Sequence, residues 1–145
     1  MRVEPFGSLF EGLTYSSSHG DYNSLQLICD ADEIKAVIDF STAKKLPVTW
    51  ELARNYMQSG SVDGSFNAAR FKQYLSRYQK YSPLNKHDLR CILNVYLYQL
   101  ARSSYGYREY LEKKALNADG LLKFAHWRTE MCRSLEQMIP LVVGQ

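Results

Sequence analysis

The chain has 145 residues, 46% of them hydrophobic and 23% charged, with 18 basic against 15 acidic side chains and a net charge of +3. This composition excludes a wholly disordered chain, and no stretch reaches the roughly 18 consecutive apolar residues of a membrane span. No signal-peptide pattern opens the sequence, and Cys29, Cys91 and Cys132 lie far apart without a CxxC pair, which favours reduced thiols over a disulfide framework or a zinc site. The composition predicts a soluble, cytoplasmic protein of one domain.

The charge is distributed unevenly along the chain. Residues 1–53 carry four basic and eight acidic side chains, a net charge of −4, whereas residues 54–145 carry fourteen and seven, a net charge of +7. The lysines and arginines of the second part are scattered along helical patterns and do not cluster. We therefore expect a solvated helical surface, with neither a nucleic acid nor a membrane as partner.

The first third of the chain predicts a loose segment followed by a β-hairpin. Residues 1–18 contain a proline, two glycines and three consecutive serines, which is typical of a loosely structured lead-in. Residues 25–29 and 34–40 are short apolar runs rich in β-branched residues, and residues 30–33 (Asp-Ala-Asp-Glu) separate them. This pattern predicts two strands joined by a polar turn.

The rest of the chain has a helical period. Residues 44–47 break the chain before a helix expected over residues 50–58, which Thr49 is expected to cap and which ends at Gly60. Apolar side chains then recur every three or four residues from Phe66 up to the stop at Ser82 and Pro83.

Three further helical segments follow. Asn85 or Asp88 is expected to begin the first, residues 107–116 form the second, and residues 121–138 form the last, which ends before Pro140. The fold class predicted is therefore α+β and mainly helical.

The residues with the clearest chemical pattern flank the hairpin. His19-Gly-Asp21 precedes it, and Ile38-Asp39-Phe closes it. A hairpin can bring the carboxylates of Asp21 and Asp39 to one cleft. Phosphoryl transfer uses such a pair, because one carboxylate orients the attacking hydroxyl and the other, with an amide oxygen, holds Mg²⁺ against the phosphates.

This string resembles the catalytic half of the aminoglycoside phosphotransferase and choline kinase-like family. The family motif reads His-Gly-Asp-x-x-x-x-Asn, followed by a hairpin and Ile-Asp-Phe/Trp, and residues 47–53 (PVTWELA) are similar to its next helix start. The specific part covers about residues 15–57, and the later helices fit by pattern. The resemblance implies the carboxy-terminal lobe of a kinase-like fold over residues 19–145, with ATP and Mg²⁺ as cofactors.

Carried over by position, the resemblance makes Asp21 the catalytic aspartate and Asp39 the main Mg²⁺ ligand. His19 would brace the loop, and Glu51, in place of the usual Asp, would pack beneath it. Gln26 would be the amide ligand to the metal.

The sequence departs from the family in three ways. The metal-binding Asn is replaced by Gln26, whose side chain is one methylene longer, and Asn23 is a weaker alternative ligand. The motif is preceded by only 18 residues, with no glycine-rich phosphate loop and no strand lysine. We therefore expect a catalytic lobe without its nucleotide-binding amino-terminal lobe.

Two functions follow from these expectations. The first is an ATP- and Mg²⁺-dependent phosphotransferase that acts on the hydroxyl of a small molecule. The +7 charge of residues 54–145 favours a neutral or anionic substrate over a polycationic aminoglycoside. The alternative is a non-catalytic remnant or interaction module, which pairs with a separately encoded lobe or forms a homodimer through apolar surface near residues 1–18 and the hairpin.

Overall fold

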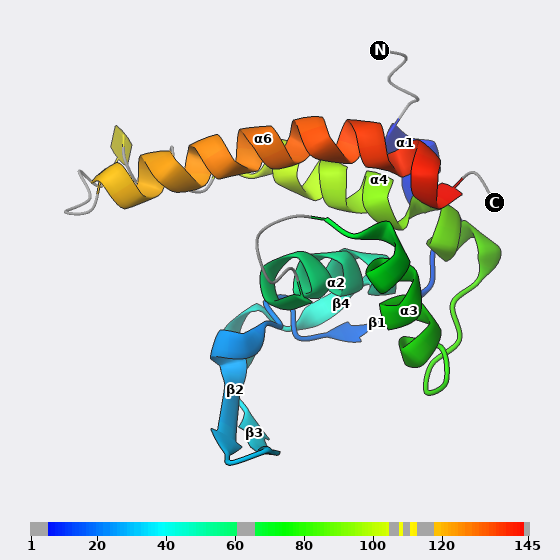
Figure 1. Ribbon diagram of the computed structural model, residues 1–145, viewed down its shortest axis with the longest axis horizontal. Coiled ribbons are helices and arrows are strands. Elements are labelled where there is room, and N and C mark those ends of the chain that lie inside the picture. The colour runs from blue at the N-terminus through cyan, green and yellow to red at the C-terminus, as the bar shows by residue number, and fades with distance from the viewer. Residues whose placement is uncertain (1–5, 61–65, 105–107, 109–110, 113–117, 144–145) are drawn as a thin grey trace. The chain divides into compact units, whose positions relative to one another are not determined.

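The computed structural model describes residues 6–60, 66–104, 108, 111–112 and 118–143 (Figure 1). It has an α+β fold with two small antiparallel sheets, which confirms the coarse fold class expected from the sequence. The chain forms two compact units, Met1–Tyr96 and Leu97–Gln145.

The first unit holds the four strands that the structure describes. Its elements in chain order are α1 (Phe6–Phe10), β1 (Tyr15–Ser18), the 3₁₀ turn η1 (Ser24–Gln26), β2 (Leu27–Asp30), β3 (Glu33–Val37), the 3₁₀ turn η2 (Phe40–Thr42), β4 (Lys44–Pro47), α2 (Val48–Asn55), the π-helical turn η3 (Tyr56–Gly60), α3 (Ala68–Tyr78) and the start of α4 (Lys86–Arg102).

Strands β2 and β3 form the predicted hairpin. Leu27 pairs with Val37 and Asp30 pairs with Glu33, with a bulge between Ile28 and Cys29. Figure 1 shows this hairpin extending away from β1, β4 and α2. Its apolar side chains are therefore poorly covered, and Ile28 and Ile34 are about half exposed (49% and 58%).

Strands β1 and β4 form a second sheet that the sequence did not predict. The pairing joins Tyr15 to Pro47 and Ser18 to Lys44. The expectation of a loose lead-in is therefore wrong for residues 15–18, and residues 44–47 form a strand instead of only breaking the chain. This sheet fixes the segments immediately before the His-Gly-Asp sequence and immediately before α2.

Helix α2 begins two residues earlier than expected. It starts at Val48, and Pro47 occupies the capping position without a side-chain hydrogen bond. Thr49 does not cap the helix: its side chain is fully buried, and its hydroxyl has no hydrogen-bond partner among the described residues. Proline suits this position because its missing N–H would have no partner inside the helix.

Helices α3 and α4 begin at asparagine caps. Asn67 accepts a hydrogen bond from the Arg70 backbone N–H, and Asn85 accepts one from Asp88 while the Asp88 carboxylate accepts one from the Asn85 N–H. This reciprocal pair confirms that a helix starts at Asn85. The core of the unit is made of large apolar side chains, namely Leu13, Val48, Leu52, Tyr56, Met57, Phe71, Leu75, Leu84, Ile92, Leu93, Val95 and Tyr96.

The second unit contains the end of α4 and the long helix α6 (Ala118–Val143). Ala125, Met131 and Leu135 are buried at helical spacing on one face of α6. The helix continues through Pro140, so the predicted end before this proline is wrong. The segment expected at residues 107–116 lies mostly outside the described residues. None of the described helices is both long and apolar enough to cross a membrane.

Candidate functional site

The loop His19–Asn23 lies between β1 and η1 and packs tightly on the η2 turn. Gly20 has a φ of +86°, and a Cβ atom there would come within 2.4 Å of the Thr42 carbonyl oxygen. The Thr42 hydroxyl donates a hydrogen bond of 3.1 Å to the His19 carbonyl oxygen. Glycine is therefore required at position 20 by both the backbone angle and the close approach.

Glu51, in the first turn of α2, holds this loop by its backbone. Its Oε1 accepts a 2.7 Å hydrogen bond from the Gly20 N–H, and its Oε2 accepts a 3.1 Å bond from the His19 N–H. A carboxylate that receives two backbone N–H groups forms charge-assisted hydrogen bonds, which are stronger than neutral ones. Glu51 thus contacts the loop beneath which the resemblance placed it.

His19 links the loop to the end of the hairpin. Its side chain is buried, and Nε2 lies 2.7 Å from the Ile38 carbonyl oxygen. Because a carbonyl oxygen can only accept, this nitrogen carries the proton. The imidazole also packs on the Phe40 ring, with the ring centroids 4.6 Å apart. These contacts agree with the bracing role expected for His19.

Asp21 forms an ion pair that the sequence did not predict. Its Oδ1 contacts the Nη2 of Arg54, and the Nη1 of Arg54 donates a 2.9 Å hydrogen bond to the Gly20 carbonyl oxygen. Both side chains are about one-third exposed. The sequence did hold one indication of Arg54: it lies three residues after Glu51, so both side chains are on one face of α2.

Asp39 is held in an unusual conformation at the end of the hairpin. Its φ and ψ are 61° and 63°, in the left-handed region that non-glycine residues rarely adopt. The Ser41 hydroxyl donates a 2.6 Å hydrogen bond to its Oδ1, and the Ser41 N–H lies 3.4 Å from the same oxygen. These bonds lower the pKa of the exposed Asp39 carboxyl group below its ordinary value, so Asp39 is anionic at neutral pH.

Gln26 lies beside the Asp39 turn. The Ile38 N–H donates a 2.9 Å hydrogen bond to the Gln26 carbonyl oxygen, so Gln26 is paired with the residue directly before Asp39. In the part of the chain that the structure describes, the Gln26 side chain makes no hydrogen bond. The Asn23 side chain, in contrast, donates to the Asp21 carbonyl and accepts from the Leu25 N–H, so its amide is used in the turn.

Asp21 and Asp39 therefore lie on two separate turns, and the hydrogen bond between His19 and Ile38 connects these turns. Among the described residues, no three His, Cys, Asp or Glu side chains gather closely enough to hold a metal ion. Gln26 and Asp39 lie close together along the backbone, because Gln26 is hydrogen-bonded to Ile38, which directly precedes Asp39. Mg²⁺ prefers oxygen ligands, and it usually keeps several waters and takes further ligands from substrate phosphates.

A second cluster, at the start of α4, has a structural role. The Cys91 sulfur lies 3.7 and 3.6 Å from the two ring nitrogens of His87, so it does not face one of them as a nucleophile faces its base. Burial raises the pKa of the Cys91 thiol, which keeps it protonated and unreactive. This pair does not form a catalytic dyad.

No protein-family model, curated protein or solved structure matches this chain. Any functional conclusion therefore depends on the residues and geometry described above.

Proposed function

We propose that this chain carries the carboxy-terminal, kinase-like half of an ATP- and Mg²⁺-dependent phosphotransferase acting on small-molecule hydroxyls, related to the aminoglycoside phosphotransferase and choline kinase-like family. The observation that carries the proposal is the clamp on His19. The Glu51 carboxylate accepts a hydrogen bond from the His19 backbone N–H, and the His19 ring is hydrogen-bonded to the Ile38 carbonyl next to Asp39. This clamp supports the proposal because phosphoryl transfer needs the two aspartates on turns of fixed relative position.

In the proposed reaction, the substrate hydroxyl oxygen attacks the γ-phosphorus of ATP. A new P–O bond forms to that oxygen, the bond between the γ-phosphorus and the leaving ADP oxygen breaks, and the hydroxyl proton passes to the Asp21 carboxylate. Arg54 fixes Asp21 by pairing with one carboxylate oxygen and with the Gly20 carbonyl, which leaves the other oxygen, Oδ2, for the substrate. Most of the rate enhancement then comes from positioning and charge neutralisation.

Asp39 and Gln26 are the proposed magnesium ligands. Asp39 is exposed and anionic, and its Oδ2 makes no hydrogen bond among the described residues, while Oδ1 is held by Ser41. The ion would neutralise charge on the phosphate oxygens. The left-handed backbone of Asp39 also supports the proposal, because strained residues that the surroundings hold in place cluster at functional sites.

Calorimetric titration of ATP with Mg²⁺ into the purified chain tests the proposal. We expect saturable binding that Asp39→Ala abolishes. Asp32→Ala is the matched control, because Asp32 is an exposed aspartate at the tip of the same hairpin, and it should bind like the wild type. Absence of binding at millimolar nucleotide, or equal loss in both variants, would contradict the proposal.

We further propose a substrate that is not a polycation, because residues 54–145 carry a net charge of +7. Phosphorylation of kanamycin-type substrates above that of sugars or amino alcohols would refute this part of the proposal.

A second candidate function is an interaction module, which pairs with a separate lobe or with a second copy. It is favoured by the exposed apolar side chains near the hairpin, namely Leu25, Ile28, Ile34, Ile38 and Phe40. Light scattering of the wild type and of Ile34→Lys tests it. A dimer that the substitution dissociates supports the module, and a strict monomer at all concentrations argues against self-association.

A further inference from the structure

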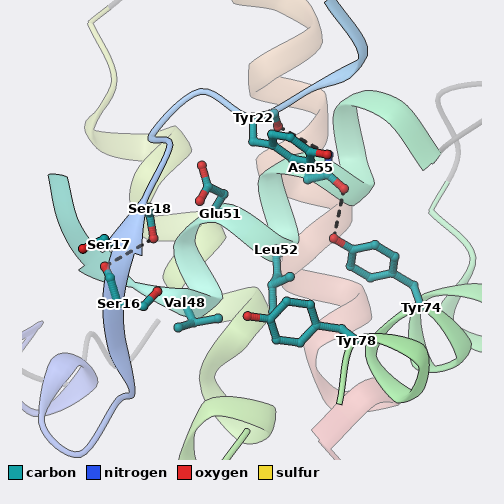
Figure 2. Close-up of a pocket in the computed structure, with 10 residues that line it drawn as sticks. All are labelled: Ser16, Ser17, Ser18, Tyr22, Val48, Glu51, Leu52, Asn55, Tyr74 and Tyr78. Atoms are coloured by element: carbon teal, nitrogen blue, oxygen red, sulfur yellow. Dashed lines mark hydrogen bonds between the residues drawn. The ribbon is translucent and has the colours of Figure 1, made fainter. Parts of the chain in front are cut away.

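A pocket lies beside the His19–Asn23 loop, inside the first unit. Its volume is about 220 Å³, below the roughly 300–1,000 Å³ typical of pockets for drug-sized ligands, so any occupant is small. Strand β1, helix α2 and helix α3 supply most of its walls (Figure 2). The ten lining residues are Ser16, Ser17, Ser18, Tyr22, Val48, Glu51, Leu52, Asn55, Tyr74 and Tyr78.

Hydroxyl groups dominate the polar part of this lining. Ser16, Ser18 and three tyrosines contribute them, whereas the Ser17 side chain points to the opposite face of β1 (Figure 2). The hydroxyls of Ser16 and Tyr78 have no hydrogen-bond partner among the described residues. Figure 2 shows the Tyr78 hydroxyl pointing across the pocket toward Val48, where a ligand can reach it. A hydroxyl both donates and accepts, so these groups suit a ligand that is itself rich in hydroxyls.

The tyrosine side of the pocket is held in place by hydrogen bonds. The Tyr74 hydroxyl donates a 2.9 Å bond to the Asn55 Oδ1, and the Asn55 Nδ2 lies 3.4 Å from the Tyr22 carbonyl oxygen. Burial raises the pKa of Tyr74, so this hydroxyl keeps its proton at physiological pH. The pocket therefore presents fixed aromatic rings next to the free hydroxyls, without the entropic cost of ordering them.

The charge of the lining argues against a charged ligand. Among the described residues that line it, Glu51 is the single ionisable side chain apart from the tyrosines, and none is a lysine, arginine or histidine. Both Glu51 oxygens already accept backbone N–H groups from His19 and Gly20. An anion would find no cation here, and a cation would compete with the two N–H groups for a carboxylate already in use.

We propose that this pocket binds a small neutral polyhydroxy compound the size of a monosaccharide. The hydroxyls of Ser16, Ser18 and Tyr78 would hydrogen-bond its hydroxyl groups, and the apolar surface of Leu52 and Val48 would contact its carbon skeleton. Pockets that combine an apolar floor with a few placed polar groups bind ligands in this way.

The pocket also adjoins the residues of the proposed reaction. Ser18 directly precedes His19, and Tyr22 directly follows Asp21, so the pocket wall continues into the loop on both sides. Its role as the site of the phosphoryl acceptor rests on the proposed function. Binding of the ligand does not, since it needs neither ATP nor Mg²⁺.

Saturation-transfer NMR with three related sugars tests the binding. Glucose, glucosamine and glucuronate share one ring and differ in charge, and each is presented separately to the full chain without nucleotide. We expect transfer to glucose to exceed transfer to either charged sugar. Equal transfer to all three, stronger transfer to a charged sugar, or no transfer to any of them would overturn the proposal.

Two variants locate the site. Tyr78→Phe removes a free hydroxyl while keeping the ring, and we expect it to weaken glucose binding about five-fold, the effect of one hydrogen bond. Tyr81→Phe is the control, because Tyr81 lies outside the pocket and is 91% exposed. The affinity of this variant for glucose should match that of the wild type. Unchanged binding in Tyr78→Phe, with a native-like spectrum, would contradict this location.

The sugar-binding experiments and the Mg²⁺-ATP binding experiment can fail independently of each other. Glucose binding without any Mg²⁺-ATP binding would leave the pocket standing and remove the phosphotransferase. Nucleotide binding that Asp39→Ala abolishes, without binding of any neutral sugar, would remove the pocket assignment alone.

Discussion

The backbone N–H of Gly20 donates a 2.7 Å hydrogen bond to the carboxylate of Glu51, 31 residues further along the chain. The second oxygen of the same carboxylate accepts from the His19 N–H. The first turn of α2 therefore sets the conformation of the loop that carries Asp21, and the stability of the fold is coupled to the geometry of the candidate site.

Glu51→Gln should disturb this loop although it keeps the size of the side chain. A glutamine amide has one oxygen, so its NH₂ group would face one of the two N–H donors and leave that donor without a partner. The expected loss is about 1–3 kcal/mol in the free energy of unfolding, measured by urea denaturation. Glu33→Gln, on an exposed side chain, is the control. Equal stability of the two variants would contradict the proposed role of Glu51.

Gly20→Ala and Gly12→Ala should differ in their effect. Both glycines have positive φ, +86° and +80°, so alanine is strained at both. At Gly20 the new Cβ would also lie 2.4 Å from the Thr42 carbonyl oxygen, whereas at Gly12 its nearest contact is the His87 ring at 3.7 Å.

We expect Gly12→Ala to cost about 1–2 kcal/mol, the strain of the left-handed backbone alone. Gly20→Ala should cost about 2–4 kcal/mol and also disturb the loop. Thermal or urea unfolding of both variants measures the difference. A smaller cost at Gly20 than at Gly12 would show that η2 does not press on the loop.

The fully buried Asp88 carboxylate ties α4 to the segment before β1. It accepts hydrogen bonds from the N–H and hydroxyl of Thr14, at 2.8 and 2.7 Å, and from the N–H of Asn85. Asp88→Asn turns an acceptor into a donor against these groups and should destabilise the fold by about 2–4 kcal/mol. Asp32→Asn, at the exposed hairpin tip, should be nearly neutral in the same denaturation experiment, and similar losses in both would be the contrary result.

Tyr74 makes stability sensitive to alkaline pH. Burial raises its pKa above the ordinary value of 10.0, with Tyr78, Tyr22 and Glu51 adding to the shift. Above pH 10.0 the unfolded chain therefore releases this proton while the folded chain keeps it, so stability falls as pH rises.

Tyr74→Phe should flatten this alkaline decline, while costing about 1 kcal/mol at neutral pH through loss of the bond to Asn55. Tyr81→Phe should leave the profile unchanged. Urea unfolding as a function of pH makes the comparison, and an unaltered alkaline slope in Tyr74→Phe would count against the buried hydroxyl as its source.

Local patterns predicted the hairpin and the start of α4 better than the second sheet. The apolar runs around the acidic turn at residues 30–33 identify β2 and β3, and Asn85 identifies the start of α4. Strands β1 and β4 pair Ser17 with Lys45 and Ser18 with Lys44, so they lack the apolar alternation that marks a strand. Their pairing depends on long-range context that a local pattern does not contain.

Around the candidate site, too, the sequence indicated some contacts and missed those that depend on tertiary structure. Glu51 could be placed because its segment follows the motif at a family-like position. Arg54 was missed, because its spacing from Glu51 indicates a shared face of α2 but not how α2 approaches the loop 33 residues away in the sequence. Thr49 carried a typical capping signal, but its side chain is buried and Pro47 takes the capping position. Tertiary packing here overrides local preference.

The most direct test of the central claim is paramagnetic broadening of backbone amide signals by Mn²⁺ with ATP, since Mn²⁺ takes the same oxygen ligands as Mg²⁺. The account predicts that the amides of Gln26, Ile38 and Asp39 lose intensity first, and that Asp39→Asn prevents this loss. The acidic hairpin tip provides an internal comparison, because Asp30, Asp32 and Glu33 would attract the ion by charge alone. Earlier broadening at that tip, or the same pattern in Asp39→Asn, would contradict a metal site at Asp39.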